Sequence, residues 1–403
     1  MDIAVVGSGI AGLTAAWLLA RRHRVTLFEQ AARQGGHTHR LELDCWSICV
    51  GLTRLLDRLG IRGRATGMSF SVRNAASGLE YNGDSLSGLF AQRRNLCSPR
   101  FLGMLKDILR FNRHAPRLLA LAGSGPSLAD YLADGGYGKA FAGDYLGPMA
   151  AAIWSVPTLA LDEFPAKRVI EFFANHGLLS LFDRPQWYVV EGGSSSYVDR
   201  ILADLPDVRL GCPVRRIERD ADGVTVATDA DRLRFDALVL ATHSDEALGL
   251  LADPSPAERE ILGAIRFQDN AVVLHSDPRV MPINRRAWAA WNYYLPTGGT
   301  DQVTVSYWMN ALQHIDVPTP LLVTLNQDER IAPEQVHARM RYSHPVFDGP
   351  AVAAQTRRSE ISGQRHTWYC GAWWRYGFHE DGCASAVDVA QDFGIELEGR
   401  GAP

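Results

Sequence analysis

The first forty residues constrain the fold of this chain more than any other stretch. Residues 3 to 6 are apolar and mostly β-branched, a composition typical of a strand buried on both faces. Gly7, Gly9 and Gly12 follow in the spacing G-x-G-x-x-G, and the next apolar stretch predicts a helix over residues 10 to 21. Such glycines allow a tight turn, close approach of a pyrophosphate and close helix packing. The pattern therefore predicts a dinucleotide site at the helix N-terminus.

An acidic residue follows the second predicted strand at the expected distance. Residues 25 to 28 form that strand, and Glu29 comes directly after it, about twenty residues beyond the first glycine. A carboxylate here can accept hydrogen bonds from the adenosine ribose hydroxyls and repels a 2′-phosphate, so NADP is disfavoured. Glycines before a helix also form ordinary turns, but the strand, helix and acid together favour the nucleotide interpretation.

A second glycine pattern continues from the first. Arg33, Gly35, Gly36 and His37 complete the spacing E-x3-R-x-G-G-H with Glu29, which is similar to a pattern of flavoproteins related to amine oxidases and phytoene desaturases. The resemblance implies that the paired glycines contact the flavin-side phosphate and that Arg33 supplies a cation near it. The alternative is a flexible turn with a solvated charge. We expect FAD as the cofactor.

Length and composition set the outer limits of the fold. With 403 residues and 46% hydrophobic content, the chain can bury a large core. We predict an α/β fold in which a Rossmann-like FAD-binding domain, a parallel sheet with helices, is interleaved with a mixed α+β substrate domain. The FAD-binding domain is assigned residues 1–75, 186–252 and 356–403, and the substrate domain is assigned residues 76–185 and 253–355.

Charge and cysteine content exclude several classes of protein. A formal net charge of −4 gives no general attraction for nucleic acid. We expect no signal peptide, because the apolar N-terminus lacks a basic n-region and already forms the first strand and helix. We expect no membrane-spanning helix, because no stretch reaches about eighteen uninterrupted apolar residues. The six cysteines are scattered, which favours reduced thiols in a cytoplasmic protein. Cys45 and Cys49 lack a second ligand pair, so no metal site is predicted.

The middle of the chain separates into helical and strand-like regions. Residues 88 to 185 are mainly helical in pattern, and the glycine turn at residue 192 is expected to enter a helix capped by a serine. Residues 233 to 248 predict a strand that returns to the nucleotide-binding sheet before a helix. Ser255 begins a capping-box pattern with proline at its second position. Residues 270 to 325 alternate as in an antiparallel sheet.

The C-terminal region carries the last cofactor signal. Residues 367 to 372 predict a final strand, and Gly382 is expected near the start of a short helix. That helix N-terminus could stabilise negative charge on the reduced flavin. The alternative is an ordinary aromatic loop before a terminal helix.

The residues between that strand and helix have two interpretations each. The aromatic cluster at Trp373, Trp374, Tyr376 and Phe378 could line a substrate channel but is more often plain core. The titratable residues 379 to 381 are interpreted as cofactor-binding or helix-capping groups rather than acid–base catalysts.

Several short motifs together carry a closer resemblance: GGHTH, AAIWSVP, NHGLL, ATHSDEAL, HPVFD and GFHEDG. They resemble a bacterial family of predicted NAD/FAD-binding proteins, FAD-dependent oxidoreductases within the flavin amine oxidase and phytoene desaturase superfamily. The resemblance implies bound FAD, two domains and oxidoreductase activity. The frequent association of that family with enzymes of the cyclopropane fatty acid synthase type suggests a role in lipid metabolism, by analogy only.

The residues assigned to the cofactor site are Gly7, Gly9, Ile10, Ala11, Gly12, Glu29, Arg33, Gly35, Gly36, His37, Val214, Ala241, Thr242, Gly371, Glu380, Asp381 and Gly382. No catalytic residue is assigned.

Two departures from the family pattern bear on activity. The segment over residues 41 to 60 is shorter than in that family, which puts the contacts to the flavin ring in doubt. Amine oxidases place a lysine near flavin N5, whereas this chain has no lysine after Lys167.

Three functional classes follow from these observations. The favoured class is an FAD oxidoreductase that removes hydride from a carbon centre of an apolar, acyl-chain-like substrate and passes electrons to an external acceptor. The others are a redox-neutral flavin isomerase and a degenerate, non-catalytic member.

One basic segment suggests a partner. Residues 93–117 combine basic side chains with apolar residues at helical spacing, which allows peripheral contact with the inner membrane face. A domain helix with a solvated basic face is the plainer alternative.

Overall fold

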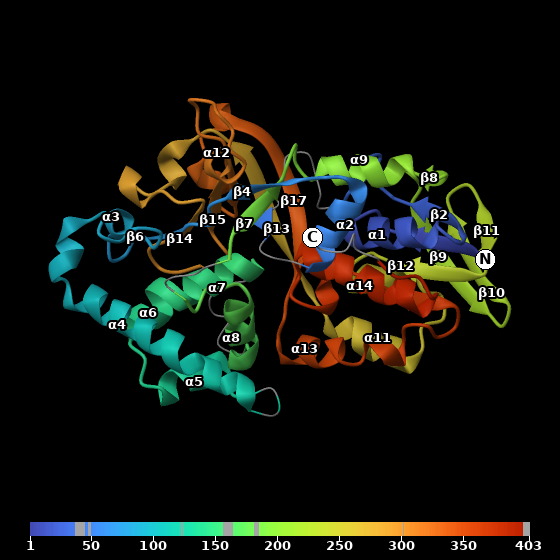
Figure 1. The fold of residues 1–403 in the computed structure, drawn as a ribbon, viewed down its shortest axis with the longest axis horizontal. Helices are drawn as coiled ribbons and strands as arrows, with labels where there is room; N and C mark the ends of the chain where they lie inside the picture. The colour runs from blue at the N-terminus through green and yellow to red at the C-terminus, as the bar shows by residue number, and fades with distance from the viewer. Residues whose placement is uncertain are drawn as a thin grey trace. The chain divides into compact units, whose positions relative to one another are not determined.

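The chain forms two compact units (Figure 1). Unit 1 comprises Met1–Arg64, Val190–Phe267 and Pro345–Pro403, and unit 2 comprises Ala65–Val189 and Gln268–His344. The computed structural model describes residues 1–36, 45–46, 50–121, 123, 125–155, 164–180, 185–300 and 302–397. The predicted α/β fold with an interleaved second domain is confirmed.

Unit 1 is built around a five-stranded parallel sheet in the order β18-β12-β1-β2-β8. Its strands are β1 (Asp2–Val6), β2 (Arg24–Phe28), β8 (Asp207–Arg209), β12 (Ala237–Leu240) and β18 (Thr367–Tyr369). A second sheet contains β9 (Val214–Asp220), β10 (Gly223–Thr228) and β11 (Arg232–Phe235). The helices are α1 (Ile10–Leu19), α2 (Val50–Leu59), α9 (Ser195–Ala203), α10 (Ser244–Leu250), α11 (Pro256–Ala264), α13 (Gly349–Gln355) and α14 (His379–Asp392).

The order of the parallel sheet follows from the burial of its central strand. Residues 3 to 6 of β1 are buried, and β1 pairs in parallel with β2 on one side and with β12 on the other. The predicted return of residues 233 to 248 to the nucleotide-binding sheet is therefore confirmed. Helix α1 packs against α14 and α9, as Figure 1 shows, and all its residues except Trp17 are buried.

Unit 2 contains a seven-stranded sheet in the order β17-β13-β16-β15-β14-β5-β6. Its strands are β5 (Phe70–Asn74), β6 (Leu79–Asn82), β13 (Phe267–His275), β14 (Trp291–Leu295), β15 (Val305–Trp308), β16 (Leu322–Leu325) and β17 (Val336–Pro345). The short strands β4 (Gly63–Thr66) and β7 (Trp187–Val190) lie at the sequence boundaries of this unit, and β3 (Cys45–Trp46) belongs to the residues of unit 1. The helices are α3 (Leu86–Leu89), α4 (Pro99–His114), α5 (Leu128–Asp134), α6 (Lys139–Phe141), α7 (Gly147–Trp154), α8 (Ala166–Asn175) and α12 (Met309–Leu312).

Several local predictions can be compared with these elements. The antiparallel sheet over residues 270 to 325 is confirmed for the pairs β13–β16, β15–β16 and β14–β15, although β14 pairs with β5 in parallel. The capping box is confirmed, since Ser255 Oγ accepts from the N–H of Glu258. The prediction that a serine side chain caps α9 is wrong, because the N-cap residue Ser194 makes no side-chain hydrogen bond to the helix. Among the described residues, none of the helices has the length and apolar character needed to cross a membrane.

The two units divide at slightly different residues from the predicted domains. Unit 1 includes α11 and α13, which the prediction placed in the substrate domain. The reason is packing, because Ile261 and Leu262 of α11 and Ala351 of α13 belong to the same buried cluster as Leu238 of β12. These helices carry no pattern that distinguishes one core from another before folding.

Candidate dinucleotide site

The glycine turn between β1 and α1 leaves no room for side chains at two positions. Gly7 has φ of +102°, and its N–H donates to the Phe28 carbonyl at 2.9 Å. A Cβ at Gly7 would lie 2.8 Å from the Ala241 carbonyl oxygen, and one at Gly12 would lie 1.9 Å from the Gly7 oxygen. The turn must therefore be glycine at both positions for α1 to pack so closely on the sheet.

Gly9 differs from these two glycines because it faces open space. Gly9 is the N-cap residue of α1 and provides no side-chain cap. No neighbouring atom lies within 4 Å of the place where a Cβ on Gly9 would be. The first N–H groups of a helix have no intrahelical partners, and the helix dipole favours an anion beside them. This uncapped end, which begins at Ile10 and Ala11, is suited to binding a phosphate.

The second glycine motif lies directly against the first. Gly35 and Gly36 have φ of +98° and +57°, which favour glycine. The Gly35 N–H donates to the carbonyl oxygen and to Oγ of Ser8, both at 3.1 Å. A Cβ at Gly36 would lie 3.1 Å from the Cα of Gly9. The Arg33 guanidinium donates to the Gly36 carbonyl at 2.9 Å, which brings a cation to the same turn.

Glu29 is buried and anchors both motifs. Its Oε2 accepts hydrogen bonds from the N–H and the hydroxyl of Ser8 at 3.0 and 2.6 Å, and its Oε1 accepts from the Ala31 N–H at 2.9 Å. The carboxylate thus holds the glycine turn to the end of β2. Because a carboxylate oxygen can accept two hydrogen bonds, Oε1 retains capacity for another donor. Its role in binding a ribose stays a prediction.

The end of β12 is bonded to Trp373, and the end of β18 is bonded to α14. The indole N–H of Trp373 donates to the Thr242 carbonyl at 3.0 Å, and a Cβ at Gly371 would lie 2.2 Å from the same indole nitrogen. Ser385 Oγ accepts from the Gly371 N–H and donates to the Gly382 carbonyl, both at 2.9 Å. Ser385 therefore joins two predicted cofactor residues, Gly371 and Gly382, and the carbonyl of a third, Thr242, is held by Trp373.

The start of α14 is tied to two other helices. Asp381 is buried, and its Oδ2 accepts from the Phe378 N–H at 2.9 Å, which caps α14. Glu380 Oε2 accepts from the Leu52 N–H of α2 at 2.5 Å. A Cβ at Gly382 would lie 2.7 Å from a methyl carbon of Ile10. Capping of α14 by Asp381 is confirmed, whereas Glu380 bonds α2 instead. The expectation of a short helix is wrong, since α14 has 14 residues.

The remaining predicted residues have separate places. Val214 is buried in the apolar cluster that also contains Phe28 and Phe235. Trp373 and Trp374 belong to this cluster as well, so the core interpretation of the two tryptophans is confirmed. His37 and most of the shortened segment before residue 50 lie outside the described residues.

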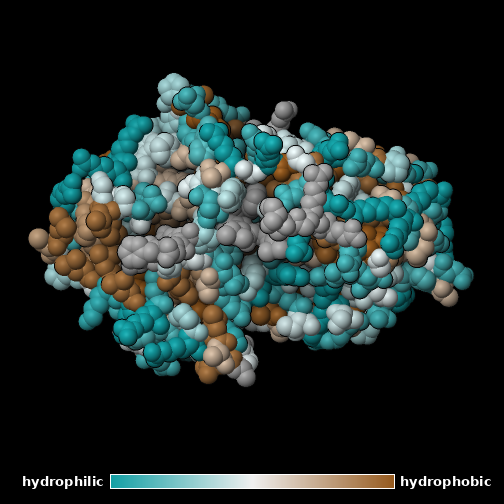
Figure 2. Space-filling view, viewed as in Figure 1, coloured by the Kyte–Doolittle hydropathy of each residue, from teal (hydrophilic) through white to brown (hydrophobic). Residues whose placement is uncertain are grey.

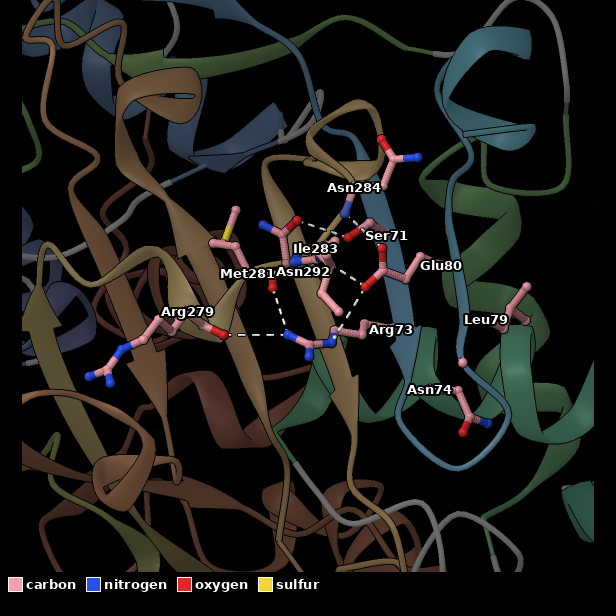
Figure 3. Close-up of polar contacts among 12 residues, drawn as sticks. Ser71, Arg73, Asn74, Leu79, Glu80, Arg279, Met281, Ile283, Asn284 and Asn292 are labelled. Carbon is pink, nitrogen blue, oxygen red and sulfur yellow. Dashed lines mark hydrogen bonds and ion pairs between the residues drawn. The ribbon is translucent and has the colours of Figure 1, made fainter. Parts of the chain in front are cut away.

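Unit 2 contains a buried ion pair that organises one of its loops (Figure 3). Arg73 Nε lies 3.5 Å from Glu80 Oε1, and an Arg73 Nη donates to the Met281 carbonyl at 2.8 Å. The two oxygens of Glu80 accept from the N–H groups of Ile283 and Asn284, both at 2.8 Å. The pair connects strands β5 and β6 to this loop.

A row of buried polar side chains crosses the same sheet. Ser71 Oγ donates to the Asn292 side-chain carbonyl at 2.8 Å, as drawn in Figure 3. Thr324 Oγ donates to Ser306 Oγ at 2.8 Å on the neighbouring strands. All four groups are satisfied within the sheet, so they are structural. Among the described residues, no group of three or more His, Cys, Asp or Glu side chains could hold a metal ion.

Sequence reasoning missed Ser8 and Ser385. Both are fully buried, and each hydroxyl joins two predicted cofactor residues. Ser8 could have been found, because it occupies the variable position inside the first glycine pair. Ser385 gives no such signal, since it lies inside a helix.

Two family models match the chain. The model of the NAD(P)-binding Rossmann-like domain matches residues 5–54, and that of the flavin containing amine oxidoreductase matches residues 144–333. The chain is 48% identical over 59 residues to the L-amino-acid oxidases of Pseudechis australis and Bungarus fasciatus. This stretch is 14% of the chain and spans only 11% of the length of those relatives.

Solved structures are similar over nearly the whole chain. A putative protoporphyrinogen oxidase from Exiguobacterium sp. 255-15 has a TM-score of 0.68 and 17% identity and covers 97% of this chain and 98% of its own. A putrescine oxidase has a TM-score of 0.68 and 16% identity with the same coverage. The fatty acid isomerase from P. acnes has a TM-score of 0.67 and 17% identity and covers 98% of both chains. With the two motifs and the parallel sheet in place, residues 144–333 of this chain match the flavin-containing amine oxidase family.

Proposed function

We propose that unit 1 binds FAD and that the protein is a flavin-dependent oxidoreductase. The observation that carries the proposal is the contact between Gly36 and Gly9, which places the paired-glycine turn beside the uncapped N-terminus of α1. A dinucleotide has two adjacent phosphates, and the first N–H groups of α1 together with the Arg33 guanidinium beside them fit that charge. The family match supports FAD rather than a nicotinamide cofactor.

The chain's own residues would divide the binding as follows. The N–H groups at the start of α1 would bind the pyrophosphate, and Arg33 would add positive charge next to the Gly36 carbonyl. The free acceptor capacity of Glu29 would receive a ribose hydroxyl. When bound, FAD supplies a hydride acceptor, so the protein needs only to orient a C–H bond and exclude water.

We further propose an apolar substrate that resembles an acyl chain. The chain has no lysine after Lys167, so the lysine that amine oxidases place near the flavin has no counterpart in that part of the sequence. Amine oxidation is therefore not proposed. A redox-neutral isomerase is the second candidate, and the likeness to the fatty acid isomerase from P. acnes over 98% of both chains motivates it.

Anaerobic titration of the flavin-loaded protein with lipids distinguishes these functions. Saturated and unsaturated fatty acids would be added, and the absorbance band of the oxidised flavin at about 450 nm would be followed. An oxidoreductase bleaches with its substrate and recovers with oxygen or a quinone. An isomerase changes the double-bond pattern of the lipid without lasting bleaching. Protein that binds FAD yet does neither with any lipid contradicts the acyl-chain proposal.

A further inference from the structure

Exposed apolar side chains gather in one part of unit 2. Nine large apolar side chains are markedly exposed among the described residues, and five of them lie between residues 86 and 121. These five are Leu86, Leu96, Leu102, Leu109 and Leu121, with exposed fractions from 44% to 76%. Figure 2 shows hydrophobic residues gathered where Figure 1 places α3 and α4. Single exposed leucines are ordinary, but such a concentration indicates a contact surface.

Helix α4 shows that the leucines are not part of the unit's own packing. Its inner face buries Phe101, Met104, Ile108 and Phe111. Leu102 and Leu109 are exposed, seven residues apart, on a stripe that also contains Lys106 and Arg113. Not all the apolar residues of the predicted membrane segment are available for contact, because Phe101 and Ile108 face the core. The helix therefore has an apolar inner face and an outer stripe on which exposed leucines alternate with cations.

Positive charge surrounds the exposed leucines. Residues 86 to 121 contain seven basic residues and one acid, Asp107. That acid is already engaged, because it pairs with Arg110 at 3.0 Å and accepts from the Gly138 N–H at 2.8 Å. The remaining exposed cations include Lys106 and Arg113, which form no ion pair within the described part of the chain.

We propose that residues 86–121, here called the α3–α4 surface, bind the surface of an anionic lipid bilayer. The leucines would enter the boundary between headgroups and acyl chains, and the unpaired cations would contact lipid phosphates. Nucleic acid would use the cations but not the leucines. A neutral protein partner would use the leucines but leave the cations without counter-charges. The proposal is independent of the cofactor and of the reaction.

Vesicle flotation of the full chain tests the proposal. The vesicles are phosphatidylcholine alone or with about one quarter phosphatidylglycerol, at low and at physiological salt. We expect binding to anionic vesicles that is at least about tenfold stronger than to neutral ones and that weakens with salt. Circular dichroism and gel filtration verify that each variant is folded.

Two pairs of variants separate the surface from general effects. Leu102→Ser/Leu109→Ser and Lys106→Glu/Arg113→Glu should each lower binding to anionic vesicles by about tenfold or more. Leu210→Ser replaces an exposed leucine of unit 1, and Arg200→Glu/Arg259→Glu gives the same change of net charge there. These controls should stay within about twofold of the original protein.

Three results would overturn the proposal. One is the absence of binding to either kind of vesicle. Another is a loss of vesicle binding in the control variants that equals the loss in the α3–α4 variants. That result would show that the overall charge of the protein, and not this surface, attracts it to the vesicles. The third is a protein that does not bind vesicles and whose oligomeric state changes in the leucine variant. That result would make the α3–α4 surface a protein interface.

Discussion

Gly36 is the residue on which the contact between the two glycine motifs depends. Gly36→Ala should weaken FAD binding by about tenfold or more, because alanine adds left-handed strain and a methyl group 3.1 Å from the Cα of Gly9. Gly394→Ala is a matched control, since Gly394 has φ of +69° in unit 1 and open space around it. Fluorescence titration with FAD measures both. Equal affinities in the two variants would contradict the joint role of the motifs.

Ser8 shows how a single hydroxyl supports the same turn. Ser8→Ala removes the hydrogen bonds to Glu29 and from the Gly35 N–H, both of which are buried. Both partners keep a hydrogen bond to the Ser8 backbone, but a hydrogen bond to a charged group is worth about 1.5 to 3 kcal/mol, so the free energy of unfolding should fall by about that amount. Urea unfolding measures the loss. Ser77→Ala, which changes an exposed turn hydroxyl, should alter stability by less than about 0.5 kcal/mol.

Several elements of unit 1 are joined by one buried ion pair. Arg219 of β9 donates to both oxygens of Glu258 on α11 at 2.5 and 2.9 Å, and neither side chain is appreciably exposed. Tyr369 of β18 donates to Glu258 at 2.6 Å. Both β-sheets of the unit are thus fixed to the helix that the sequence assigned to the other domain.

Removing the carboxylate should be costly, because it leaves the buried Arg219 with the partly exposed Asp253 as its remaining ion-pair partner. Glu258→Gln should lower the free energy of unfolding by about 3 to 5 kcal/mol. Glu260→Gln on the same helix breaks an exposed pair with Arg357 and should cost no more than about 1 kcal/mol. Urea unfolding of both variants measures the effect. Similar losses of unfolding free energy in the two variants would show that the Arg219–Glu258 pair is not a major source of stability.

The same pair should make unit 1 sensitive to acid. Burial by itself would raise the pKa of Glu258, but hydrogen bonds from Arg219, Tyr369 and the Ser255 N–H outweigh it and lower the pKa to about 2. A depressed pKa adds stability above the ordinary value near 4.5, and this stability is lost as pH falls toward 2. Unfolding between pH 5 and pH 3 should therefore show a steeper loss in the original protein than in Glu258→Gln. Parallel curves would contradict this assignment.

At the scale of the whole molecule, the sequence predicted what is local. The glycine turn, Glu29 and the capping box at Ser255 each depend on neighbouring residues, and the strand at residues 237–240 joined the expected sheet. The parallel pairing of β14 with β5 could not be predicted, because it joins strands from distant segments that share an ordinary alternating pattern. Ser385 was missed for the same reason, since its partners lie on other elements.

The most direct measurement of the central claim is a comparative titration of the cofactor-free protein with FAD and with FMN. The account predicts one FAD bound per chain, with FMN at least about a hundredfold weaker, because FMN lacks the adenylate half that the α1 N-terminus and Glu29 would hold. Gly36→Ala should reduce the FAD affinity, because it disturbs the approach of the two glycine motifs that would hold the two phosphates. A protein that stays colourless in excess FAD, or that binds FMN equally well, would contradict the claim that the two glycine motifs hold a flavin dinucleotide.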